Sequence, residues 1–215
     1  MIKDEIIKRI LSSIILIPIV LFFLIKGSFL FNFFIFICFI ITTYEWVSMS
    51  KKNISKIFGI IFIIFAFYTI FKIRNVFDSD YLHLLLVLII CISTDIGGYL
   101  FGKIFKGPKL TKISPKKTYA GVIGSFLLPI IFTNLFLDFV TNKNFFEFST
   151  EIFVFVLVIS FVSQLGDIII SYFKRKSKIK DTGYIIPGHG GILDRIDGMI
   201  FAFPLSYLVF LNWNF

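Results

Sequence analysis

Charged residues are scarce in this chain. They make up 16% of its 215 residues, whereas soluble domains carry about 25%. Hydrophobic residues reach 57%, phenylalanine alone occurs 31 times, and the mean hydropathy is +0.92. The apolar residues form long runs rather than alternating or amphipathic patterns. This composition excludes an ordinary soluble domain and predicts an all-α polytopic integral membrane protein.

Cysteine is also scarce, and a cleavage site is missing. Cys38 and Cys91 both fall inside apolar runs without disulfide or metal-ligand spacing, so we expect small buried side chains. The apolar run Ile10–Ile25 resembles a signal peptide, but no small-residue cleavage site follows it, so we expect it to be retained. Internal repeats and low-complexity linkers are missing too, which favours a single membrane domain over residues 1–215.

The apolar runs predict about seven transmembrane helices, most of them near the ~20 residues that cross a bilayer. They cover Ile10–Ile25, Phe29–Val47, Ile54–Phe71, Tyr81–Phe101, Tyr119–Val140, Ile152–Phe173 and Ile196–Trp213.

The basic residues predict the orientation. With the N-terminus in the cytoplasm, 18 of the 22 lysines and arginines lie on the cytoplasmic side, as the positive-inside rule requires. The other four are Lys26, Lys72, Arg74 and Lys143. The same clustering between apolar runs explains the net charge of +9 better than nucleic-acid binding does, so we expect no nucleic-acid partner.

The most polar stretch is Ser171–Asp197. Five basic residues fall between Lys174 and Lys180, a Pro-Gly-His-Gly-Gly loop surrounds His189, and Asp194 and Asp197 follow three positions apart. Cations, a glycine loop and two carboxylates on one helical face are typical of a metal-assisted phosphate site. Alternatively, the two aspartates favour a helix N-terminus and the histidine is a loop hydrogen-bonder; no general base is assigned to it.

A second polar stretch runs from Asp95 to Gly121. Asp95 and Tyr99 share a helix face, and glycines at 97, 98 and 102 allow a close helix approach. Six lysines follow, the last two within the sequence Ser-Pro-Lys-Lys-Thr, and these lysines and hydroxyls suit phosphate oxygens. The alternative is an ordinary basic loop lying against anionic lipid. We place the active site on the cytoplasmic loops 103–118 and 174–195.

Three of the acidic residues inside apolar runs are functional candidates, because a charge there costs about 2.5–3.5 kcal/mol on insertion scales. Asp95 is one. Asp167 shares a helix face with Ser171 and Lys174; alternatively it only pairs with a lysine to permit insertion. Glu45 stands between Tyr44 and Trp46, which favours an interfacial anchoring segment.

The stretch Ser171–Asp197 follows the pattern S-x-F-K-R-x4-K-D-x-G-x2-I-P-x-H-G-G-I-x-D-R-I-D, which resembles the signature of the phosphatidate cytidylyltransferases, or CDP-diacylglycerol synthases. The Asp95–Gly121 stretch is similar to that family's other cytoplasmic motif. The resemblance implies an Mg2+-dependent reaction, in which CTP and phosphatidate give CDP-diacylglycerol and diphosphate. It also implies a K+ ion beside the magnesium, a homodimer, and a place in the bacterial inner membrane with the active site on the cytoplasmic side.

The resemblance further implies a set of site residues. The metal-holding carboxylates would be Asp167, Asp194 and Asp197. The catalytic group would comprise Asp95, Lys116, Lys117, Lys174, Arg175, His189 and Arg195, and the substrate-binding group Ser114, Thr118, Ser171, Lys180 and Asp181. Two positions depart from the family pattern, because Ala120 and Ile170 stand where an acidic residue is usual.

Three other functions stay open. A CTP-using enzyme could act on another lipid acceptor, because Phe and Ile runs pack all lipid chains alike. An ion-coupled transporter would need polar residues across the whole membrane, but the polar residues stop in the inner half. An inactive relative is the third alternative, suggested by Ala120 and Ile170.

Overall fold

The computed structural model describes the chain except for residues 1, 77–80, 111–116, 142–148, 189 and 213–215. Within these described parts the chain is helical, and the only β pairing consists of two isolated bridges. The helices are α1 (Ile2–Lys26), α2 (Ser28–Met49), α3 (Asn53–Val76), α4 (Leu82–Phe105), α5 (Tyr119–Thr141), α6 (Thr150–Lys176), α7 (Leu193–Ile196) and α8 (Met199–Asn212).

Five of these helices are long and apolar enough to cross a membrane. They are α2 to α6, so the prediction of an all-α membrane protein is confirmed. Two further apolar segments are shorter, Ile14–Lys26 within α1 and Met199–Asn212 in α8. A helix of 14 residues rises only about 21 Å, less than the ~30 Å hydrocarbon core. The predicted count of seven spans is therefore not established by the helices themselves.

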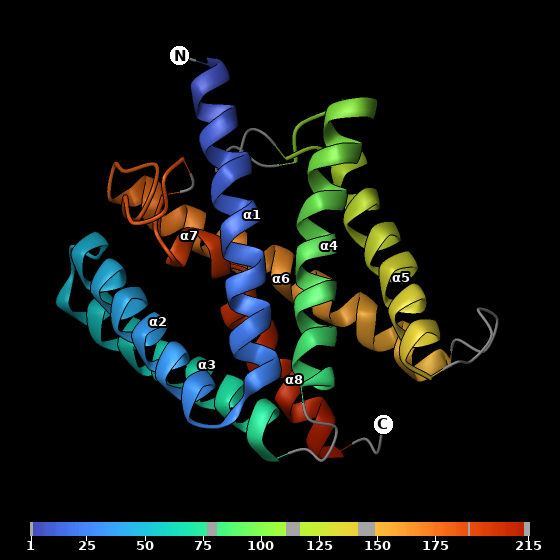
Figure 1. The fold of residues 1–215 in the computed structure, drawn as a ribbon. Coiled ribbons are helices and arrows are strands. Elements are labelled where there is room, and N and C mark those ends of the chain that lie inside the picture. Colours follow the sequence, from blue (N-terminus) through green and yellow to red (C-terminus); the bar gives the residue numbers. More distant parts are fainter. Residues whose placement is uncertain (1, 77–80, 111–116, 142–148, 189, 213–215) are drawn as a thin grey trace.

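Helices α4 and α5 lie side by side (Figure 1) because glycines line their contact. A Cβ atom added at Gly97 would lie 2.1 Å from the carbonyl oxygen of Gly124, and one at Gly121 would lie 2.7 Å from that of Gly98. Only glycine permits backbones to come this close. The close approach predicted at residues 97 and 98 is confirmed, and it fixes Asp95 beside the start of α5.

Helices α6 and α8 also pack closely at glycines. A Cβ at Gly198 would lie 2.5 Å from the Ser163 hydroxyl oxygen, and one at Gly166 would lie 2.6 Å from the Phe201 ring. The predicted span Ile196–Trp213 was wrong in one respect, because the chain turns at Asp197 and Gly198, between α7 and α8. This turn separates the polar α7 from the apolar α8.

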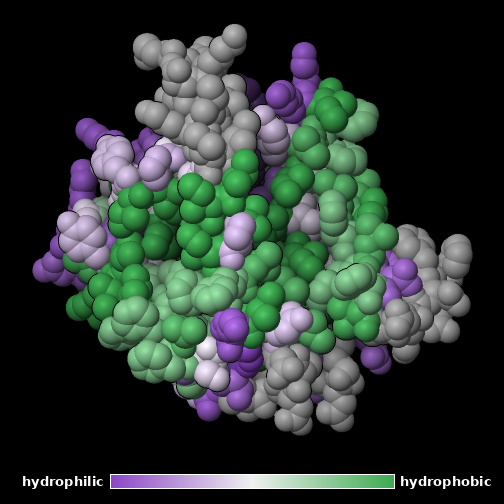
Figure 2. All heavy atoms as spheres, in the orientation of Figure 1, coloured by the Kyte–Doolittle hydropathy of each residue, from purple (hydrophilic) through white to green (hydrophobic). Residues whose placement is uncertain are grey.

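The surface of the described chain is strongly apolar. Figure 2 shows a broad hydrophobic band with hydrophilic residues above and below it. Large side chains such as Phe29, Phe58 and Phe139 are at least 70% exposed. Contact between so large an apolar surface and water would be unfavourable, as expected for a surface that faces lipid. Of the cysteines, Cys91 is fully buried as predicted, Cys38 is only partly buried, and both are free thiols.

Candidate active site

One polar cavity of about 360 Å3 opens among α4, α5, α6 and the segment that ends in α7. Its lining combines residues from both polar stretches of the sequence with neighbouring residues of α4, α5 and α6. They are Thr94, Asp95, Gly98, Tyr99, Lys117, Thr118, Gly121, Val122, Ser125, Gln164, Asp167, Lys174, Asp181, Asp194, Arg195 and Asp197. Nine of the predicted site residues are among them, although residues 95 and 197 are about a hundred positions apart in the chain.

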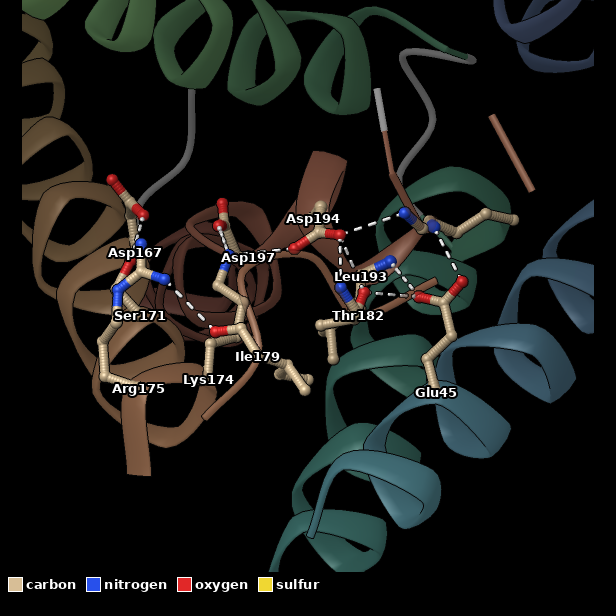
Figure 3. A network of polar contacts seen from close by, with 12 residues as sticks. Glu45, Asp167, Ser171, Lys174, Arg175, Ile179, Thr182, Leu193, Asp194 and Asp197 are labelled. Atoms are coloured by element: carbon tan, nitrogen blue, oxygen red, sulfur yellow. Dashed lines mark hydrogen bonds and ion pairs between the residues drawn. The ribbon is translucent and has the colours of Figure 1, made fainter. Parts of the chain in front are cut away.

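The first ion pair of the cavity joins α6 to the segment before α5. Lys117 Nζ lies 2.6 Å from Asp167 Oδ2. Ser171 Oγ donates a hydrogen bond of 3.2 Å to Asp167 Oδ1 (Figure 3). Ser171 does not itself line the cavity. The predicted common face of Asp167, Ser171 and Lys174 is confirmed, because the first two are bonded and Lys174 also faces the cavity.

A second, more buried ion cluster surrounds Lys174. Its Nζ lies 2.9 Å from Asp194 Oδ1 and 3.6 Å from Asp197 Oδ2, with all three side chains at most 13% exposed. Burial raises the pKa of Asp197 well above its ordinary value, and the negative charge of Asp167 raises that pKa further. The positive charge of Lys174 alone therefore does not offset the burial and mutual repulsion of these carboxylates, and a further cation would stabilise their ionised forms.

Asp194 also fixes the polar segment that precedes it. Its Oδ2 accepts hydrogen bonds from Thr182 N at 2.7 Å, Thr182 Oγ1 at 3.0 Å and Gly191 N at 3.0 Å. Burial would raise the pKa of Asp194, but the bonds from Gly191, Lys174 and Thr182 outweigh burial and lower it. Gly190 has a φ of +85°, which favours glycine, and a Cβ there would lie 2.6 Å from Asp194 Oδ2.

The loop before α5 is paired at its described ends. Lys109 and Thr118 form a β bridge, and Leu110 N donates to Lys117 O at 2.8 Å. Thr118 Oγ1 accepts from Gly121 N at 3.1 Å and so caps the first turn of α5 while it faces the cavity. Lys117 is thereby held at the cavity from a defined backbone.

Some predicted residues lie elsewhere. Arg175 is exposed and donates to Ile179 O at 3.2 Å, and Lys180 is exposed, so neither lines the cavity. Ser114, Lys116 and His189 lie outside the described residues. Ile170, one departure from the family pattern, is 2% exposed within the apolar core. The roles of all these positions stay predictions.

Glu45 lies in a different environment from the one that the sequence predicted. The prediction of an interfacial anchor was wrong, because Glu45 is 2% exposed and faces inward from α2. It accepts hydrogen bonds from Thr182 Oγ1 at 3.0 Å, Ile192 N at 3.0 Å and Leu193 N at 2.8 Å (Figure 3). The signal was available, since a carboxylate inside an apolar helix needs a partner. Gln164 and Ser125, which also line the cavity, were not predicted.

The fit of the site to a metal ion depends on its oxygen donors. Among the described residues, no three His, Cys, Asp or Glu side chains form a group that could hold a metal ion by themselves. Mg2+, however, is usually bound through one or two carboxylates together with waters and substrate phosphates. Among the residues that the structure describes, five aspartates and three cationic side chains line the cavity, and these carboxylate oxygens suit a divalent cation shared with a substrate.

Comparison with known proteins gives a consistent result. A model of the Cytidylyltransferase family matches residues 7–75 and 50–213. A Rickettsia conorii protein named phosphatidate cytidylyltransferase is 34% identical over 213 residues, which cover 96% of this chain and 92% of that protein. A protein of the same name from Rickettsia bellii is 36% identical over 217 residues, which cover 96% of this chain and 91% of that protein. Another, from Staphylococcus haemolyticus, is 40% identical over 139 residues, which cover 62% of this chain and 51% of that protein.

Proposed function

The chain belongs to the cytidylyltransferase family, and from this premise we propose how its cavity makes CDP-diacylglycerol from CTP and phosphatidate. The observation that carries the proposal is the convergence of Lys117, Lys174 and Arg195 with buried aspartates in one cavity. Cations that face carboxylates in one enclosed space are suited to a polyanionic nucleotide and a phosphate nucleophile.

The reaction needs little acid–base chemistry from the protein. A phosphate oxygen of phosphatidate attacks the α-phosphorus of CTP, a new P–O–P bond forms, and the bond to the leaving diphosphate breaks. The nucleophile is already anionic, so no strong general base is required. We infer an in-line displacement without a covalent enzyme intermediate. The difficulty is charge repulsion, and Lys117, Lys174 and Arg195 are placed to neutralise phosphate oxygens.

Magnesium completes the proposal. Asp167, Asp194 and Asp197 would hold Mg2+ together with substrate phosphates, and the bound ion would neutralise the diphosphate as it leaves. Lys174 and Lys117, which now pair with these aspartates, would orient toward phosphate oxygens in the substrate complex. A K+ ion beside the magnesium stays a prediction from the family resemblance.

The membrane placement is proposed from sequence and structure together. Seven spans, including the short α8 and the apolar part of α1, would put 18 of 22 basic residues on the cytoplasmic side. The cavity would then open on the cytoplasmic side of a bacterial inner membrane. CTP could enter from water, and phosphatidate could enter sideways from the lipid. A homodimer and the absence of a nucleic-acid partner are part of the same proposal.

An assay with a panel of acceptor lipids tests the substrate. Purified protein in lipid–detergent micelles would receive labelled CTP and Mg2+ with phosphatidate, a polyprenyl phosphate or an ether-linked phosphatidate. We expect labelled liponucleotide with phosphatidate. Product formed only from another acceptor would refute the proposed substrate, and no product from any acceptor, with folded protein, would refute the proposed activity.

A further inference from the structure

Glu45 lies outside the lining of the cavity, yet it holds the segment that supplies Asp194. None of the ion pairs between described residues involves Glu45. Its charge is met by hydrogen bonds from Thr182 Oγ1, Ile192 N and Leu193 N, residues that are 137 to 148 positions away in the chain. A buried carboxylate is costly unless such donors satisfy it, so these bonds fix α2 against the segment.

Two of these donors are the backbone N–H groups at the start of α7. Ile192 precedes the helix and Leu193 opens it, and N–H groups at a helix start have no partner within the helix. Ile192 has no side chain able to cap them, and the structure shows no side-chain cap from it. Glu45 therefore does from another helix what a local capping residue usually does.

Thr182 links Glu45 directly to the ion cluster. Its hydroxyl oxygen lies 3.0 Å from Glu45 Oε2 and 3.0 Å from Asp194 Oδ2. The hydroxyl has one proton, so it can donate to one of the two carboxylates at a time. A change at Glu45 would thus alter the hydrogen bonding of Asp194 as well as the position of the backbone next to it.

Two glycines of the segment pack closely against the Glu45 carboxylate. A Cβ at Gly191 would lie 2.4 Å from both Glu45 oxygens, and one at Gly183 would lie 2.8 Å from Oε1. The same end of α2 also receives the beginning of the segment, because Ser177 Oγ donates to Met49 O at 2.7 Å. Helix α2 therefore holds both ends of the segment between α6 and α7.

We propose that Glu45 is a positioning residue for the cytidylyl transfer, acting by holding Thr182 and the start of α7 so that Asp194 faces Lys174. The inference rests on the function proposed for the cavity. It separates Glu45 from the aspartates that face the substrate, since the carboxylate would act through the polypeptide and not on the reacting phosphates.

Glu45→Gln tests this role. The variant keeps the shape but replaces one oxygen with an NH2 group, which cannot accept from a backbone N–H. We expect kcat to fall about 10- to 100-fold, as for partners that orient metal ligands, with a much smaller change in the KM for CTP. We also expect faster hydrogen exchange at the Ile192 and Leu193 amides. The matched control is Glu151→Gln, at an exposed glutamate at the start of α6. This variant should change neither kcat nor the hydrogen exchange of the Ile192 and Leu193 amides.

Thr182 supplies a second pair of variants in case Glu45→Gln does not fold. Thr182→Val removes the bridging hydroxyl and should lower kcat, whereas Thr182→Ser keeps the hydroxyl and should retain it. Unchanged exchange at residues 192 and 193 in Glu45→Gln would overturn the proposal, and so would faster exchange without loss of kcat. The exchange comparison requires no turnover. A parent protein without activity would therefore count against the proposed function, while exchange would still decide whether Glu45 holds the segment.

Discussion

Replacing Lys174 with methionine should destabilise the protein strongly. Its ammonium lies 2.9 Å from Asp194 and 3.6 Å from Asp197. At an effective dielectric constant of about 20, each contact corresponds to roughly 5 kcal/mol of Coulomb attraction. Desolvation offsets much of this, but removal of one partner leaves buried carboxylates uncompensated, which typically costs about 3–5 kcal/mol. We expect Lys174→Met to lower the free energy of unfolding by that amount.

The assay is equilibrium unfolding of the purified protein in mixed micelles, with two comparisons. Lys176→Met removes a charge from the same turn, but Lys176 is exposed, so it should cost less than about 0.5 kcal/mol. The double variant Lys174→Met, Asp194→Asn should be more stable than the sum of its single variants predicts, by about 0.5–3 kcal/mol. Equal stability of Lys174→Met and Lys176→Met, or strictly additive changes in the double variant, would refute the buried ion cluster.

Two further predictions concern the helix contact and the pH response. Gly97→Val should cost about 1–3 kcal/mol of unfolding free energy or more, because its Cβ would lie 2.1 Å from a backbone oxygen of α5; Gly102→Ala, with 3.1 Å to its nearest neighbour, should cost less. Equal costs would contradict the α4–α5 packing. Because the folded pKa of Asp194 is lowered, its stabilisation should be complete above the ordinary value of 3.8 and lost as the pH falls through the lowered folded pKa. Hydrogen exchange at Thr182 and Gly191 should rise in that window in the parent but not in Asp194→Asn; identical pH profiles would contradict this.

Much of the fold and the site could be predicted because both leave local traces in the sequence. Apolar runs predict the helices, since a bilayer core demands apolar residues along about 20 positions. The pattern around Asp194 and Asp197 predicts a phosphate site because its residue types have few other uses at that spacing. The glycines at 97 and 98 predict a close helix contact because they have no side chain, and the structure confirms it, since a Cβ there would overlap α5.

The remainder depends on contacts between distant segments. The partners of Glu45 are two backbone N–H groups and one hydroxyl, and no residue type in the sequence marks them. Gly198, at the turn before α8, packs against Ser163 of α6, a contact between distant segments, whereas the apolar run alone predicted one continuous span. Arg175 and Lys180 look like their neighbour Lys174 in sequence, but Arg175 on the last turn of α6 and Lys180 in the segment after it are both exposed.

The most direct test of the account follows each phosphate of CTP. Parent protein and Asp194→Asn would be incubated with phosphatidate and Mg2+, using CTP labelled at either the α- or the γ-phosphorus. We expect the parent to transfer the α label to lipid and to release the γ label as diphosphate. Chelation of Mg2+ should stop both, and folded Asp194→Asn should do neither. Transfer of the γ label to lipid, or full activity of Asp194→Asn, would contradict the account.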